Sequence, residues 1–239
     1  MRELTTMANV WTYLDPLLFA ILPYVAFFTF FLVTIQRYRS RSFSYSSLSS
    51  QFLENRLHFW GVVPFHYGIL AVLAGHVLAF LIPARILQWN SNPLRLYILE
   101  ATGLVFGILT AVGLVACIMR RLTTDKVGRV TSIGDWVVYA LLLFQVVSGV
   151  AIALVYPWGS SWFAVTASPY LWSIVKLNPL VDLIAPMPWL VKFHVINAYL
   201  VIGFFPFTRL VHVLVVPNPY LWRKPQVTRW YGKPEKSLS

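Results

Sequence analysis

Four of the five histidines in this chain lie in pairs within two very apolar segments. His66 and His76 are ten residues apart in the first segment, and His194 and His212 are eighteen residues apart in the second. A histidine inside a lipid-spanning helix is costly unless something binds it, so such residues indicate a functional site. Because imidazole is a frequent axial ligand of haem iron, two such pairs indicate two bis-histidine haems that carry electrons across a membrane.

The spacing of the pairs limits how they could bind iron. Axial ligands approach the metal from opposite sides, so neither pair can hold one haem alone. On a straight helix, His66 and His76 would be about 15 Å apart, and His194 and His212 about 27 Å. Both separations fit within the roughly 30 Å apolar slab of a bilayer, but they are unequal. Helix tilt and a kink at Pro206, where proline interrupts the helical hydrogen bonds, are expected to absorb the difference.

Two other interpretations of the histidines stay open. They could be polar residues packed between helices, or they could bind another metal. Zinc is disfavoured, because the members of each helix pair are too far apart to share one ion at bond lengths of about 2 Å. Cys117 is the only cysteine, which excludes a disulfide within the chain, a Cys-ligated iron–sulfur cluster and a covalently attached c-type haem. Any haem must therefore be non-covalent.

The composition is that of a membrane protein. Hydrophobic residues make up 58% of the chain and charged residues 11%, and the mean hydropathy is +0.68. A soluble domain carries about a quarter charged residues. The net charge of +11 is placed at the ends of apolar segments, as membrane topology requires, so nucleic-acid binding is not indicated.

Five segments have the roughly 20 apolar residues that a membrane-spanning helix needs. They lie near 13–36, 60–83, 96–119, 133–156 and 189–216. We therefore predict an all-α bundle of five transmembrane helices in residues 1–222, with a polar cytoplasmic tail at 223–239. The first segment lacks the cleavage site of a signal peptide and is read as an uncleaved helix. The proline-rich stretch 157–188 predicts an irregular outer loop with one short interfacial helix at 170–177.

The distribution of basic residues predicts the orientation. The loops 37–56 and 120–131 and the tail from Arg209 onward hold fourteen of the nineteen Lys and Arg residues. Because basic residues favour the cytoplasmic side, the N-terminus is expected outside and the C-terminus inside. The second and fifth helices then run in opposite directions. This predicts that His66 and His212 bind one haem near the cytoplasm, and that His76 and His194 bind the other nearer the outer face.

Arg209 and three glycines are further candidates near these histidines. Arg209 lies one turn before His212 and could pair with a haem propionate or, alternatively, with a lipid phosphate. Gly68, Gly75 and Gly203 would leave room for a flat macrocycle against the backbone. Small residues that allow close helix–helix packing are an equally good interpretation of each glycine.

Several stretches resemble the gamma subunit of membrane-bound respiratory nitrate reductases, a family of five-helix dihaem cytochromes b. The resemblance covers about residues 15–222. The matching residues are Leu22-Pro23-Tyr24-Val25-Ala26 with Arg37-Tyr38, Ser49-Ser50-Gln51, Phe65-His66-Tyr67-Gly68-Ile69-Leu70 with Gly75-His76, Arg120-Arg121-Leu122, and Phe205-Pro206-Phe207-Thr208-Arg209-Leu210-Val211-His212.

The resemblance implies a function in the inner (cytoplasmic) membrane. All four matching histidines would be haem ligands with the pairing given above. Quinol would be oxidised near the outer haem, and electrons would pass through the inner haem to an iron–sulfur beta subunit. They would then reach a molybdenum-containing alpha subunit on the cytoplasmic side, where nitrate is reduced. The chain would thus be the quinol-oxidising subunit of an oxidoreductase complex.

The resemblance also suggests a quinol pocket beside the outer haem. A basic residue near the start of the third helix belongs to that pocket, and the matching position is Arg95, where better-known members carry lysine. Arginine could still bind a quinone carbonyl, although it is bulkier and harder to neutralise. It could equally be a topological charge at a helix end. Gly75 and Glu100 are the other candidates, with Glu100 either a proton acceptor or a structural hydrogen-bonding residue.

Two alternative functions stay open. Related dihaem, quinone-linked cytochromes serve sulfur-metabolism and heterodisulfide-type complexes, and this chain does not specify the terminal acceptor. A non-redox membrane scaffold or a proton-gating transporter belongs to another class, and it would be colourless when purified.

Overall fold

The computed structural model describes residues 13–40 and 56–215, and the predicted tail at 223–239 lies outside these ranges. The described residues form helices and connecting turns without strands. Five helices are long and apolar enough to cross a membrane, which confirms the predicted fold class: Tyr13–Ser40, His58–Leu81, Pro93–Thr123, Ile133–Val155 and Trp189–Phe207. The side of the membrane on which each terminus lies stays a prediction.

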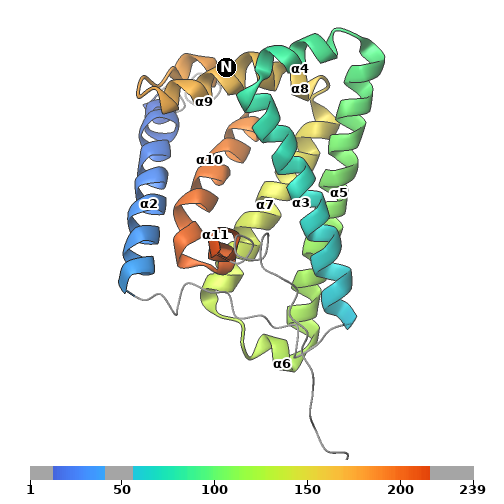
Figure 1. Ribbon diagram of the computed structural model, residues 1–239, viewed down its shortest axis with the longest axis vertical. Helices are drawn as coiled ribbons and strands as arrows, with labels where there is room; N and C mark the ends of the chain where they lie inside the picture. The colour runs from blue at the N-terminus through green and yellow to red at the C-terminus, as the bar shows by residue number, and fades with distance from the viewer. Residues whose placement is uncertain (1–12, 41–55, 216–239) are drawn as a thin grey trace, which may run out of the picture.

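The five spanning helices form an open arc of neighbours. They are α2 (Leu22–Ser40, continuing the π-helical turn η1 at Leu17–Ile21), α3 (Arg56–Leu81), α5 (Pro93–Thr123), α7 (Ile133–Val155) and α10 (Trp189–Phe204). The closest contacts are those of α3 with α5, α5 with α7, α7 with α10 and α10 with α2. Within the described chain, α3 and α10, which carry the histidines, are not a closely packed pair. In Figure 1, α10 lies beside α2 and α3 lies beside α5, with α7 between these two pairs.

Glycines hold α3 tightly against α5. A Cβ atom on Gly68 would lie 2.7 Å from the backbone nitrogen of Thr110, and one on Gly113 would lie 2.7 Å from the Cα of Phe65. Gly68 therefore serves helix packing. A Cβ atom on Gly203 would lie 3.6 Å from the Cα of Ala26, an ordinary van der Waals distance that does not require glycine. A Cβ atom on Gly75 would meet nothing within 4 Å in the described chain. Of the three candidate glycines, Gly75 is the one that faces open space.

Short helices close one end of the bundle. They are α4 (Pro83–Asn90), α8 (Gly159–Trp162), the π-helical turn η4 (Phe163–Ala167), α9 (Ser168–Val175) and the 3₁₀ turn η5 (Val181–Leu183). We call this the α9 end, and the opposite end, where α6 (Asp125–Gly128) lies, the α6 end (Figure 1). The predicted irregular loop is wrong for residues 159–175, which are helical. Its prolines precede α8 or follow α9, except Pro169, which occupies the first turn of α9, where proline is tolerated. The short helix predicted at 170–177 is present as α9 at Ser168–Val175, and its place at the membrane interface stays a prediction.

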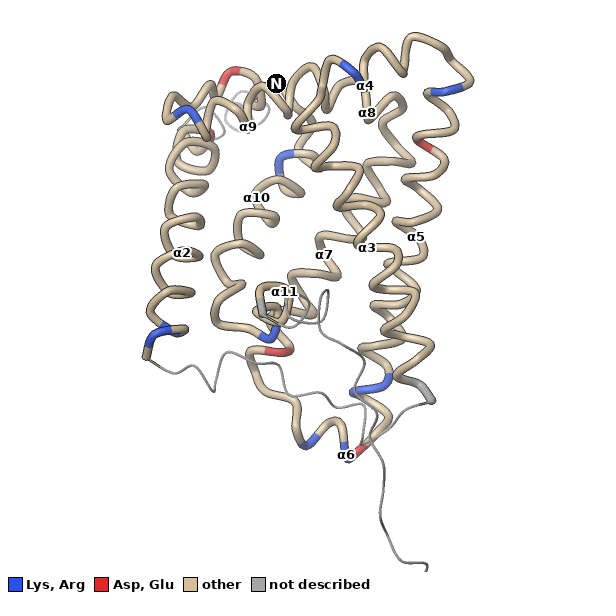
Figure 2. The backbone as a smooth tube through the Cα atoms, in the orientation of Figure 1, with Lys and Arg blue, Asp and Glu red and all other residues tan. Residues whose placement is uncertain are grey.

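The two ends differ in charge (Figure 2). The α6 end carries seven basic side chains among those described, against Asp125 and Asp135. These seven are Arg37, Arg39, Arg120, Arg121, Lys126, Arg129 and Arg209. The α9 end carries four, Arg85, Arg95, Lys176 and Lys192, against Asp15, Glu100 and Asp182. The described charges therefore favour the α6 end as the cytoplasmic one.

The fifth spanning helix ends at Phe204 instead of kinking at Pro206. Phe205–Phe207 and Arg209–Val211 form two 3₁₀ turns (η6 and η7), and Thr208 between them is extended (φ −120°, ψ 175°). The hydroxyl of Thr208 accepts a hydrogen bond from the backbone nitrogen of Leu210 at 3.2 Å. His212 then begins the short helix α11 (His212–Val215). The interruption expected near Pro206 is therefore present as a helix end followed by two turns, and the straight-helix separation of about 27 Å does not apply.

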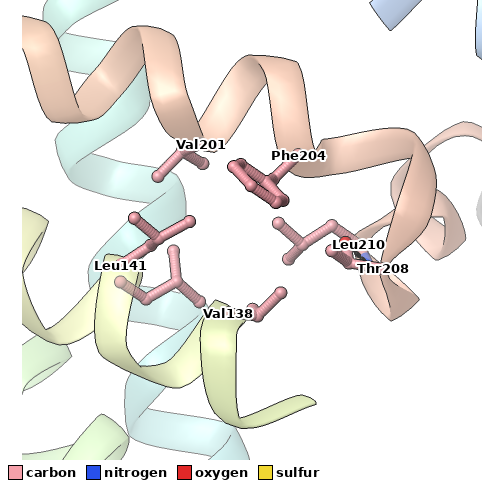
Figure 3. Close-up of a pocket in the computed structure, with 7 residues that line it drawn as sticks. Val138, Leu141, Val201, Phe204, Thr208 and Leu210 are labelled. Atoms are coloured by element: carbon pink, nitrogen blue, oxygen red, sulfur yellow. Dashed lines mark hydrogen bonds between the residues drawn. The ribbon is translucent and has the colours of Figure 1, made fainter. Parts of the chain in front are cut away.

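Apolar side chains seat this irregular segment against the bundle. Val138 and Leu141 of α7 face Val201 and Phe204 of α10, and Leu210 of η7 approaches the same group (Figure 3). These side chains line a small pocket between α7, α10 and η7, next to the segment that leads into His212.

Tyr170 fastens the α9 end to the first spanning helix. Its side chain is fully buried in a cluster that includes Phe19 and Tyr199. The hydroxyl of Tyr170 donates to the carbonyl oxygen of Phe19 at 2.8 Å and accepts from the hydroxyl of Tyr199 at 3.2 Å. Phe19 lies in the π-helical turn η1, where the backbone bonding is wider than in an α-helix. Burial raises the pKa of Tyr170 above its usual range.

Tyr170→Phe is expected to lower the free energy of unfolding by about 1–3 kcal/mol, because the Phe19 carbonyl loses a buried donor. The raised pKa also predicts a pH dependence. The unfolded chain loses the phenolic proton above about pH 10 while the folded chain keeps it, so stability falls as the pH rises further. Thermal unfolding in detergent, measured from neutral to alkaline pH, checks both points. A variant as stable as wild type at neutral pH, with the same alkaline decline, would contradict this role of Tyr170.

Candidate functional site

The structure brings His66 and His212 together from α3 and α11. Their ring centroids are 6.1 Å apart and their planes are inclined by 63°. Two imidazole rings that bind one metal ion from opposite sides have a predictable separation. Each metal–nitrogen bond is about 2 Å and each ring nitrogen lies about 1 Å from its ring centre, so the two ring centres would be about 6 Å apart. The two rings therefore lie at the separation that two axial ligands of one iron atom would have.

Backbone carbonyls orient both rings of this pair. His66 Nδ1 lies 2.8 Å from the carbonyl oxygen of Val62, and His212 Nδ1 lies 2.7 Å from that of Arg209. A carbonyl oxygen only accepts hydrogen bonds, so both Nδ1 atoms donate and both Nε2 atoms keep a lone pair. This is the tautomer that coordinates a metal through Nε2. The donor set fits a b-type haem.

His76 and His194 form a second, looser constellation near the α9 end. His76 Nδ1 donates to the carbonyl oxygen of Val72 at 2.8 Å, and its ring meets Phe163 edge-on with centroids 5.5 Å apart. Its predicted partner His194 lies on α10. Gly75, which faces open space, directly precedes His76 in the sequence. The donor chemistry of this pair also fits a haem.

His194 differs from the other three histidines because side chains of another helix bind both of its nitrogens. Its Nδ1 lies 2.9 Å from the hydroxyl of Ser148, and its Nε2 lies 3.0 Å from the amide nitrogen of Gln145. Asn197 binds the other end of the Gln145 amide at 2.7 Å. Sequence reasoning missed these three residues. These residues stand out in the sequence only as isolated polar residues in two otherwise apolar spans. The sequence does not show which of these polar residues face a histidine.

The structure places Arg95 at the start of α5, where it is tied to the α4–α5 corner. Its carbonyl oxygen accepts from the indole nitrogen of Trp89 at 3.1 Å, and its guanidinium lies 5.4 Å from the centre of that ring. The guanidinium also approaches the hydroxyl of Ser91 at 3.5 Å. Arg95 is exposed at the α9 end, on the same end of the bundle as His76.

Glu100 holds the segment that leads into α8. Its carboxylate accepts hydrogen bonds from the backbone nitrogens of Trp158 at 3.0 Å and Ser160 at 3.2 Å, and from the hydroxyl of Ser160 at 3.1 Å. Trp158 is in the left-handed region (φ 61°), which is unfavourable for a bulky residue. The hydrogen bonds of Glu100 support that strained turn, so the structural interpretation of Glu100 accounts for its observed contacts.

Glu100→Gln is therefore expected to loosen α8 by weakening charge-assisted hydrogen bonds worth about 1.5–3 kcal/mol each. Faster proteolysis between residues 156 and 162 would reveal the change. Quinol oxidation should decline only in proportion to the destabilisation. A variant with unaltered proteolysis and lost quinol oxidation would favour the proton-acceptor role of Glu100 instead.

Arg209 is paired with a carboxylate of α7. Its Nε lies 2.8 Å from the nearly buried carboxylate of Asp135, and its guanidinium also donates to the carbonyl oxygen of Val130 at 3.0 Å. Asp135 is part of the capping box that begins α7, together with Ser132. The ion pair ties η7 to the N-terminus of α7, while the carbonyl of Arg209 orients His212. A contact of Arg209 with a haem propionate stays a prediction.

Within the described residues, no group of three or more His, Cys, Asp and Glu side chains is arranged to hold a metal ion. The four histidines of the apolar spans therefore stand as two pairs. Each pair would need a ligand that supplies its own equatorial donors, as the four nitrogens of a porphyrin do.

Comparison with known proteins identifies the family. The model of the nitrate reductase gamma subunit family matches residues 15–231. The nitrate reductase gamma chain of Bacillus subtilis (strain 168) is 34% identical over 216 residues, which cover 89% of this chain and 97% of that one. The respiratory nitrate reductase 2 gamma chain of Escherichia coli (strain K12) is 29% identical over 226 residues, 91% of this chain and 97% of that one. The nitrate reductase-like protein NarX of Mycobacterium tuberculosis is 32% identical over 212 residues, 87% of this chain and 32% of the relative. The chain therefore belongs to the nitrate reductase gamma subunit family.

Proposed function

We propose that this chain oxidises quinol and passes the electrons through two non-covalent b-type haems to iron–sulfur and molybdenum subunits that reduce nitrate. Membership in the gamma subunit family supports a membrane subunit of a nitrate reductase complex. The observation that carries the haem proposal is the pair His66 and His212, whose ring centroids are 6.1 Å apart. Both rings present Nε2 as the free lone pair.

The proposed orientation places the α6 end in the cytoplasm. It is supported by the excess of basic side chains at that end (Figure 2) and by the preference of such residues for the cytoplasmic side. His66 and His212 then lie toward the cytoplasm and bind the inner haem. His76 and His194 lie toward the outer face and bind the outer haem. The partner subunits would dock at the cytoplasmic side of the inner membrane.

The chain's own residues would hold and orient the two groups. Bound haem would supply one-electron redox chemistry inside the membrane. Backbone carbonyls fix the tautomers of three of the histidines. The carbonyl oxygens of Val62, Val72 and Arg209 accept hydrogen bonds from Nδ1 of His66, His76 and His212, respectively. The proposed quinol site lies at the α9 end beside Gly75, where Arg95 would donate a hydrogen bond to a quinone oxygen. Glu100 would act there by holding α8 in place.

The test of this function is reduction of the membrane-embedded complex by a quinol. Adding a reduced short-chain quinone under anaerobic conditions is expected to produce the visible absorbance bands of ferrous b-type haem, and nitrate should then reoxidise them. Arg95→Ala should slow the reduction by quinol while dithionite still reduces both haems fully. A preparation with haem bands that no quinol reduces would overturn the quinol-oxidising role, and a colourless preparation would overturn the haem proposal.

A further inference from the structure

A continuous chain of hydrogen bonds surrounds His194 between α7 and α10. Asn197 Nδ2 donates to the carbonyl oxygen of Leu141 at 2.9 Å and to Oε1 of Gln145 at 2.7 Å. Gln145 Nε2 lies 3.0 Å from His194 Nε2, and His194 Nδ1 lies 2.9 Å from the hydroxyl of Ser148. The hydroxyl of Ser148 donates to the carbonyl oxygen of Phe144 at 2.6 Å. This series of hydrogen bonds thus begins and ends on backbone carbonyls.

Those two carbonyls fix the direction of every bond between them. A carbonyl oxygen only accepts, so the atom of Asn197 that faces Leu141 is its amide nitrogen. The same nitrogen faces Gln145, which places the Gln145 oxygen toward Asn197 and the Gln145 nitrogen toward His194. At the other end, Ser148 directs its single proton toward the backbone carbonyls of Phe144 at 2.6 Å and Gln145 at 3.1 Å, and it offers only lone pairs to His194. His194 Nδ1 must therefore donate to Ser148, and His194 Nε2 must accept from Gln145.

We infer that Ser148 is the positioning residue that sets the tautomer and ring orientation of the outer-haem ligand His194. The inference rests on the proposed function, because it concerns a haem ligand. His66, His76 and His212 are oriented by carbonyls of their own chain segments, three or four residues earlier. Nδ1 of His194 faces a hydroxyl of α7, and the backbone of Gln145 on the same helix is a further hydrogen-bonding partner of His194. Gly149 brings that helix close, since a Cβ atom there would lie 3.1 Å from the His194 ring.

Gln145 has the opposite effect on the same ligand. Its amide nitrogen approaches the one nitrogen of His194 that has a lone pair, so the amide and an iron atom compete for that position. Binding of iron requires the Gln145 amide to turn away from His194. Ser148 therefore favours haem at His194 and Gln145 disfavours it, although both residues bind the same ring from the same helix.

An acceptor on Nδ1 makes imidazole a more basic ligand, which stabilises ferric iron more than ferrous iron. Ser148→Ala is therefore expected to shift the outer haem to a more positive reduction potential and to weaken its binding by about 10- to 100-fold. The potential and the retention of the inner haem should not change. Gln145→Leu is expected to leave the outer haem bound at least as tightly as in wild type.

The experiment is a redox titration of the two haems in the intact complex, combined with the rate of haem transfer to an apoprotein scavenger. Thr102→Val is the matched control, because the hydroxyl of Thr102 donates to the carbonyl of Ile98 at 2.6 Å in the same helical pattern. The two components are assigned with single-ligand variants. An outer-haem shift in Ser148→Ala that is absent from Thr102→Val supports the inference.

Other outcomes separate the inference from the proposed function. Two haems with wild-type potentials and retention in Ser148→Ala would overturn the inference and leave the proposed function standing. Equal shifts of both haems would also overturn it, since that pattern reflects a general loosening of the bundle. Loss of the outer haem in Gln145→Leu would refute the competition at Nε2. A wild-type complex without haem would overturn the proposed function and this inference with it.

Discussion

His66→Ala is expected to remove one of the two haems and leave the other, and His212→Ala should remove the same one. The two rings lie 6.1 Å apart and would hold one haem together, so either substitution would remove one of the two side chains that hold it. His76→Ala and His194→Ala should remove the second haem. Each variant is expected to lose about half of the haem absorbance, because b-type haem has no covalent attachment to the chain. Spectra of the purified complex, with redox titration to identify the remaining component, measure the effect.

His58 supplies the matched control for these variants. It lies on α3 with His66 and His76 and belongs to neither predicted pair. His58→Ala should therefore retain both haems. Equal loss of both haems from all four ligand variants, with normal membrane insertion, would contradict the pairing. So would a His66→Ala variant that keeps both haems while His212→Ala loses one.

Gly113→Val is expected to have the largest effect on folding. A Cβ atom at this position would lie 2.7 Å from the Cα of Phe65, and a backbone atom cannot turn away as a flexible side chain does. The two helices would have to separate, and such overpacking costs about 1–3 kcal/mol or more. Because Phe65 precedes His66, the haem held by His66 should be lost first. Thermal unfolding and haem content of the detergent-extracted protein measure both effects.

Gly103→Val on the same helix is the control for this substitution. A Cβ atom there would meet nothing within 4 Å in the described chain, so this variant should fold and bind haem as wild type does. If Gly113→Val proved as stable as Gly103→Val, with full haem content, the close packing of α3 on α5 would not be needed for the site.

Much of the fold follows from the sequence because a lipid-spanning helix needs a long apolar run, and such runs are visible without any structure. A helix long and apolar enough to span a membrane is present at each of the five predicted places, although the fifth ends before the predicted residue 216. The opposite directions of the second and fifth helices predict that His66 and His212 lie at the same depth, and the structure places their ring centroids 6.1 Å apart. Their binding of one haem stays a prediction. The end of α10 at Phe204 was harder to predict, because proline in a transmembrane helix is compatible with either a kink or a stop. Thr208 decides between them by capping the following turn.

The polar surroundings of the site were less predictable. Gln145, Ser148 and Asn197 are single polar residues in apolar spans, and only the rotation of α7 against α10 shows that they meet His194. The α9 end is another example. Its prolines suggest an irregular loop. However, Pro169 lies in the first turn of α9, and the other prolines lie outside α8 and α9. Glu100, sixty residues before Ser160 in the chain, stabilises that arrangement through contacts that no local pattern reveals.

Two haems held by four histidines are the expected content of this chain, and the ratio of haem to protein tests this most directly. The purified full chain, extracted from its membrane and assayed for acid-extractable haem, is predicted to contain two b-type haems per polypeptide. His66→Ala and His76→Ala should each contain one, and the double variant should contain none. A wild-type chain with no haem, or a double variant that still holds two, would contradict the account.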